Sequence, residues 1–180
     1  MSSQTPVIAR SLSPIFTQLP VVINAGTFRR ANELGVAADY PPFQRSGCTR
    51  DLMSRPEFTL VGEPRMIRLY SATTAEILGR SDGRSGRVRD IFEALEDMGA
   101  VKLPPETGPQ YRIQYPDQPR GGLRLVYMEP IMDSAGRPRV FGIACDAKGR
   151  LWLRGYYAAP DLLYYSCVRW IFGRKSPTHS

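Results

Sequence analysis

The sequence predicts an α+β fold, and three features carry that prediction. The chain has 180 residues and a hydrophobic content of 42%, which is enough to bury a core. Residues 88–98 repeat apolar side chains at three- and four-residue steps, the period of a helix. Three runs beyond residue 122 are rich in β-forming residues and are separated by turn sequences. We expect these helical and strand regions to share one globular domain.

The first part of the chain is expected to form short elements. Residues 1–20 hold three prolines among serines and threonines and are predicted to be an extended arm. The next expected elements are strands at 21–24 and 58–61, a helix at 27–35, an irregular connection at 38–48 and a helical segment at 65–70, which Pro64 introduces. Residues 21–115 are therefore predicted to be an α+β region.

Residues 73–99 are predicted to form two helices joined by a glycine-rich turn. Thr73 and Glu76 fit a capping box, in which the hydroxyl and the carboxylate satisfy backbone N–H groups at the start of the first helix. Glycines permit the reversal that follows, and Ser85 is suited to cap the second helix, which Gly99 would end. The apolar stripe of the second helix consists of Val88, Ile91, Phe92, Leu95 and Met98.

Residues 116–175 are predicted to add an antiparallel β-meander and an apolar C-terminal segment to the same domain. Residues 103–122 hold five prolines and three glycines, so they are expected to be mostly turn, with a brief strand at 111–115. The expected meander strands are 123–131, 138–146 and 150–158, separated by DSAGR and DAKG. The apolar segment 161–175 would close the core or a subunit interface, or else form an interfacial membrane helix or a partner-binding tail.

The charge of the chain favours an anionic or acidic partner. The formal net charge is +7 with a pI near 9.6, and arginine supplies all 24 basic residues except Lys102, Lys148 and Lys175. Arginine binds phosphate and carboxylate groups through paired hydrogen bonds, which suits it to interfaces. A GC-rich genome would also raise the arginine content without selection for binding.

The sequence argues against an enzyme, a cofactor or metal site and a membrane span. His179 is the single histidine, which removes the usual general base and the Ser-His and Cys-His dyads. Cys48, Cys145 and Cys167 lie far apart, so neither a disulfide framework nor a zinc site is expected and a reducing cytoplasm is the default location. We expect no signal peptide, because the N-terminal residues lack a long apolar run, and no run approaches the roughly eighteen apolar residues of a spanning helix.

Residues 64–115 resemble the winged helix-turn-helix superfamily. TTAEILGR and VRDIFEALEDMGAVK carry the resemblance, with PPETGPQYRI in the place of the wing. The resemblance implies a non-catalytic protein, regulatory in role, that binds double-stranded DNA by placing the N-terminal end of the second helix in a groove. The expected DNA contacts are Arg84, Arg87 and Arg89 at the helix entry, Arg80 on the backbone, and Lys102 or Arg112 beside the groove.

Two other functions stay open on the sequence alone. One is a protein-interaction or assembly protein, such as a virion component of a phage or mobile element or a small inhibitor, which would dock on an acidic protein or a second copy of itself through its two terminal segments. The other is a metal-dependent nuclease, because Asp133, Asp146 and Lys148 are similar to the acidic and D-x-K elements of PD-(D/E)xK nucleases. DAKG is equally a natural hairpin turn, which favours the structural interpretation of Asp146 and Lys148.

Overall fold

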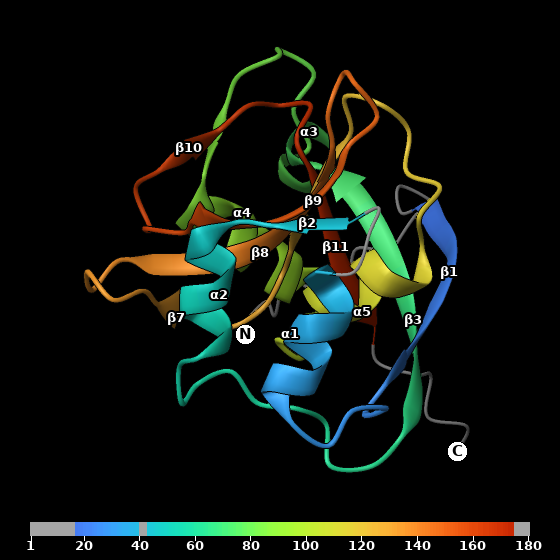
Figure 1. Ribbon diagram of the computed structural model, residues 1–180. Helices are drawn as coiled ribbons and strands as arrows, with labels where there is room; N and C mark the ends of the chain where they lie inside the picture. The colour runs from blue at the N-terminus through green and yellow to red at the C-terminus, as the bar shows by residue number, and fades with distance from the viewer. Residues whose placement is uncertain (1–16, 40–42, 175–180) are drawn as a thin grey trace, which may run out of the picture.

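The computed structural model describes residues 17–39 and 43–174 and has the expected mixed α+β composition (Figure 1). Residues 1–16 of the predicted arm lie outside the described residues. Residues 17–20 belong to the first strand of the sheet rather than to an extended arm.

Within the described residues, one curved sheet contains nine strands (Figure 1). They are β1 (Thr17–Ala25), β2 (Phe43–Arg45), β3 (Arg65–Thr73), β5 (Ala100–Val101), β6 (Leu123–Val126), β7 (Ile131–Met132), β8 (Pro138–Cys145), β9 (Leu151–Tyr157) and β11 (Arg169–Arg174). The main order is β1-β3-β11-β6-β8-β9-β2, while β5 pairs with β11 and β7 with β8. The β11–β6 and β2–β9 pairs are parallel, and the other pairs are antiparallel. Two further strands, β4 (Gly86–Arg87) and β10 (Leu163–Tyr164), form a separate ribbon.

Helices cover both faces of the sheet. Those described are α1 (Ala31–Asp39), α2 (Gly47–Met53), α3 (Thr74–Leu78), α4 (Val88–Asp97) and α5 (Thr107–Gln114). Phe141 and Gly155 are cross-strand neighbours on one face, where α5 approaches Phe141 and α2 approaches Gly155. Trp170 aligns through β6 with Gly142, so it lies on the opposite face. There Phe92 of α4 packs against the Trp170 ring, with 5.7 Å between ring centroids.

The predicted helix pair is confirmed in its main features. Thr73 and Glu76 form the capping box of α3, with Thr73 N donating to Glu76 Oε2 at 2.6 Å. The predicted stripe is the buried side of α4, since Val88, Ile91 and Leu95 are buried. The predicted cap is wrong, because Arg87 rather than Ser85 occupies the N-cap position.

The C-terminal half confirms the strands predicted at 138–146 and 150–158, which are β8 and β9, whereas the strand predicted at 123–131 is divided into β6 and β7. β7, β8 and β9 form an antiparallel meander whose turns contain Gly136 and Gly149, with φ of 70° and 80°. The apolar segment 161–175 supplies β10 and β11, and β11 lies inside the sheet between β3 and β6. The prediction that this segment closes the core is therefore confirmed.

Residues 65–70 form a strand, so the predicted helix at this position is wrong. The segment pairs with β1 along one side and, from residue 70 onward, with β11 along the other. Its apolar residues fit a helical or an alternating pattern, and the two neighbouring strands decide between them. Earlier in the chain, α1 begins later than expected, and no strand forms at 58–61.

Residues 107–114 form helix α5, so the predicted wing with a strand at 111–115 is wrong. Glu106 precedes this helix, and its buried carboxylate accepts hydrogen bonds from Gly26 N at 3.0 Å and Val61 N at 2.5 Å. Pro109 lies in the first turn, where a missing N–H leaves no helical bond unmade. The helix pair therefore has no wing in this segment, and the winged-helix arrangement is not confirmed.

Candidate functional site

Three of the arginines predicted to bind DNA lie in the exposed segment 79–87, between α3 and α4. Arg80 Nη1 donates to Ser85 O at 3.2 Å, and Arg84 Nε lies 3.4 Å from Asp82 Oδ2. The Arg84 side chain is 81% exposed, and Arg87 is exposed as well. The structure therefore gathers these arginines on one loop, which is called the arginine loop below.

The N-terminal end of α4 is covered by the segment that leads into β10. Val88 N donates to Leu162 O at 2.9 Å, and Arg89 N donates to Pro160 O at 3.1 Å. The Arg89 guanidinium lies 3.0 Å from Asp161. Two of the backbone donors that this helix start could offer to a phosphate are therefore already bound, which counts against the predicted entry of α4 into a DNA groove.

Lys102 and Arg112 do not flank a common binding surface. Lys102 Nζ lies 2.8 Å from Glu129 and 3.6 Å from Glu96, and the hydrogen bond to Glu129 raises the pKa of Lys102. Arg112 is fully buried, and burial lowers its pKa to about 10. The prediction that Arg112 contacts DNA is wrong for this structure, because a buried guanidinium cannot reach a phosphate.

The carboxylates that suggested a nuclease serve the β-turns. Asp146 Oδ1 accepts from Lys148 N and Arg150 N, both at 2.9 Å. Asp133 Oδ1 likewise accepts from the backbone of its own turn, and its Oδ2 lies 2.9 Å from Arg139 Nε. Within residues 17–39 and 43–174, no group of three or more His, Cys, Asp or Glu is placed to hold a metal ion.

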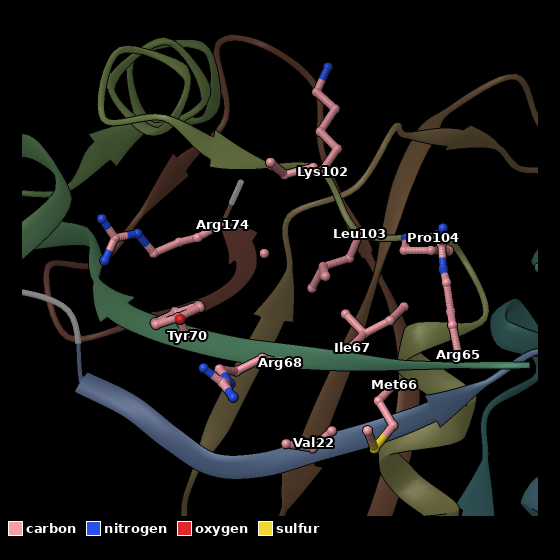
Figure 2. A pocket seen from close by; sticks show the side chains of 12 residues that line it. Val22, Arg65, Met66, Ile67, Arg68, Tyr70, Lys102, Leu103, Pro104 and Arg174 are labelled. Atoms are coloured by element: carbon pink, nitrogen blue, oxygen red, sulfur yellow. The ribbon is translucent and has the colours of Figure 1, made fainter. Parts of the chain in front are cut away.

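An open groove of about 900 Å³ lies along β3, beside the point where β11 leaves it (Figure 2). β11 pairs with residues 70–73 of β3 and then turns to β5, where Gly173 faces Val101. Residues 65–69 therefore have β1 on one side and no described strand on the other. This opening, called the β3 groove below, is lined by Val22, Arg65, Met66, Ile67, Arg68, Tyr70, Val101, Lys102, Leu103, Pro104, Gly173 and Arg174.

The β3 groove combines basic side chains with an apolar surface. Arg65 and Arg68 are exposed, and the Arg174 guanidinium lies 5.5 Å from the centre of the Tyr70 ring. Met66 is 77% exposed. Figure 2 shows the Lys102 side chain pointing away from the groove, which agrees with its pairing to Glu129. No acidic side chain lines the groove among the described residues, so its potential is positive.

Neither Arg65 nor Arg68 is among the residues predicted to bind a partner, and the groove itself is not predicted from the sequence. One sequence feature could have pointed to the groove. If residues 65–73 form a strand, Arg65, Met66 and Arg68 are exposed at its start, just before buried Leu69. Recognising it requires the strand assignment, which depends on the pairing with β1 and β11.

The chain matches no protein-family model, no curated protein and no solved structure. Across residues 17–39 and 43–174, no helix is both long enough and apolar enough to cross a bilayer.

Proposed function

We propose that this protein is a non-catalytic interaction protein whose β3 groove binds an acidic segment of a partner protein. The observation that carries the proposal is the lining of the groove, where Arg65, Arg68 and Arg174 border apolar surface and the described lining holds no acidic side chain. Guanidinium groups of this kind bind carboxylates through paired hydrogen bonds. An acidic protein segment with apolar side chains complements both the charge and the apolar surface.

The apolar character of the groove favours a protein segment over single-stranded nucleic acid. Its surface is built by Val22, Ile67, Leu103 and Pro104, and Tyr70 is the single aromatic residue in the lining of the described groove. Proteins that bind single strands stack successive bases on several aromatic rings. One ring, already approached by Arg174, offers no such series.

Charge also argues that the segment comes from another chain. Residues 1–16 contain Arg10 and no acidic residue, and residues 175–180 contain Lys175 and no acidic residue. Both terminal segments would bring side chains of the same sign into a positive groove. A separate acidic protein fits better.

Fluorescence anisotropy with a labelled nine-residue peptide that alternates glutamate and valine tests the proposal. We expect the full chain to bind this peptide and not a matched lysine–valine peptide. The double variant R65A/R68A should weaken binding by about tenfold, since each partly screened ion pair contributes up to about 1 kcal/mol. The matched variant R84A/R87A, in the arginine loop, should bind as the parent does. If the glutamate–valine peptide does not bind to the full chain, the proposed function is wrong.

Binding of duplex DNA through the arginine loop is the second candidate. Its supporting observation is the exposure of Arg80, Arg84 and Arg87 on one loop. Nearby Asp82 and Asp161 and the covered start of α4 count against it. Such binding would depend on phosphate charge rather than on base sequence.

A further inference from the structure

We infer that the acidic segment binds as an added β-strand on residues 65–69 of β3, so that it completes the sheet where β11 departs. This inference rests on the proposed function and specifies how the partner is recognised. An exposed strand edge offers backbone N–H and C=O groups to any extended chain. The hydrogen bonds of the neighbouring strands show which groups of β3 are available.

Hydrogen bonds at the far end of β3 fix the direction of its backbone groups. Thr74 N donates to Val168 O at 2.8 Å, so the backbone of Thr74 points toward β11. Ile171 O accepts from Tyr127 N at 2.8 Å and therefore points toward β6, which leaves the backbone of Phe172 to face Tyr70 in β3. Backbone direction alternates along a strand, so the even-numbered residues of β3 point toward β11 and hence toward the groove.

The contacts of β1 give the same answer independently. Asn24 N donates to Gln114 Oε1 at 2.9 Å, and Val22 O accepts from Tyr115 Oη at 2.8 Å, so both residues point away from β3. The alternate β1 residue, Ile23, must then face Ile67 of β3. It follows that Met66 and Arg68 direct their N–H and C=O groups into the β3 groove, where no described strand receives them.

The two outer edges of the β1–β3 pair differ in whether side chains bind their backbone groups. Side chains of α5 bind the outward groups of β1, since Gln114 Nε2 also donates to Asn24 O at 3.0 Å. No described side chain does the same for Met66 or Arg68. The outer edge of β1 is thus covered at Val22 and Asn24, whereas no described residue covers the edge of β3 at Met66 and Arg68.

Strand addition also defines the side chains that the partner must carry. Arg68 and Met66 lie on the same face of β3 as Tyr70, whose ring Arg174 approaches. The residue opposite Arg68 should therefore be acidic, within reach of Arg174 as well. The partner residue two positions further along lies opposite exposed Met66. The partner residue between these two points to the other face of the sheet, toward Ile67 and Leu103, so an apolar side chain suits it.

N-methylated peptides test the backbone pairing. Two versions of the glutamate–valine peptide are compared with the full chain, one methylated on every glutamate nitrogen and the other on every valine nitrogen. Methylation removes N–H donors, so methylating the set that faces β3 should weaken binding at least about tenfold, while the other set changes it little. Loss confined to the glutamate set indicates an antiparallel strand and loss confined to the valine set a parallel one. Equal effects of the two sets overturn strand addition.

Amide hydrogen exchange gives a second readout that does not depend on altered peptides. The unmodified peptide should slow exchange at Met66 and Arg68, whereas Ile67, already paired with β1, should change little. If the acidic peptide binds without protecting Met66 and Arg68, the inference fails while the proposed function stands. Two results would show that this chain fills its own groove and would overturn the inference. One is slow exchange of the Met66 and Arg68 amides in the protein without peptide, and the other is tighter binding of a peptide of residues 175–180 than of the acidic peptide.

Discussion

Arg112 is a buried guanidinium that is held by carbonyl groups. Its Nη2 donates to Tyr115 O at 2.6 Å, and its Nη1 donates to Gln118 Oε1 at 2.9 Å. Replacing Arg112 by Ala removes these bonds and leaves buried acceptors unsatisfied. We expect the free energy of unfolding, measured with urea, to fall by about 3 kcal/mol or more. Arg84→Ala is the control, because its side chain is 81% exposed and its removal should cost less than about 0.5 kcal/mol. Equal stability of the two variants would contradict the buried role of Arg112.

Asp133 makes the stability of the fold sensitive to acid. Burial opposes ionisation of its carboxyl group, but hydrogen bonds from Arg137 N and the Arg139 guanidinium outweigh it and lower the pKa from 3.8 to about 2. A group with a lowered folded-state pKa stabilises the fold above its unfolded pKa and loses that contribution as pH falls through the folded value. We therefore expect the parent to lose stability between about pH 4 and pH 2. Thermal melts should show a smaller loss over this window in Asp133→Asn, and an identical acid profile would refute the assignment.

At the level of elements, long periodic segments were predictable and short ambiguous ones were not. The apolar stripe of α4 predicts a helix, and the β-forming runs of β8 and β9, each bounded by turn residues, predict strands, so these elements could be predicted locally. Residues 65–70 are compatible with either period, and the pairing with β1 and β11 decides them. Gly108 disfavours a helix locally, yet the anchored Glu106 and burial against β8 place α5 there.

At Gly108 of α5, helix propensity and side-chain packing predict opposite effects of an alanine substitution on stability. Alanine favours a helix over glycine by about 1 kcal/mol, so propensity alone predicts that Gly108→Ala stabilises the protein. A Cβ at this position would lie 2.6 Å from Phe141 Cβ, so we expect a loss of about 1–3 kcal/mol instead. Gly47→Ala in α2 is the matched control, because a Cβ there meets nothing within 4 Å. Denaturant unfolding should rank Gly47→Ala above the parent and Gly108→Ala below it; the reverse order would show that propensity prevails.

At the level of the whole molecule, the fold divides an arginine group that the sequence presents as one. Residues 65–89 contain six arginines, of which Arg80, Arg84, Arg87 and Arg89 were predicted to contact DNA. The strand β3 carries Arg65 and Arg68 to the groove, while the loop after α3 carries Arg80, Arg84 and Arg87 elsewhere. Sequence reasoning anticipated an anionic partner from this charge. It could not assign the residues to separate surfaces, because that division follows from where β11 leaves β3.

The arginine loop and the β3 groove should bind different ligands, and one double variant in each surface can test this. We expect duplex DNA to bind weakly, with a steep salt dependence, through the arginine loop. In R84A/R87A the slope of log affinity against log salt should fall by about two, since each lost phosphate contact removes about 0.9 from it. R65A/R68A should leave this slope unchanged while weakening the acidic peptide. Anisotropy titrations of both ligands against both variants over a salt series measure all four combinations. If R65A/R68A lowers the DNA slope as much as R84A/R87A does, the β3 groove is part of a nucleic-acid surface and its assignment to a protein segment is wrong.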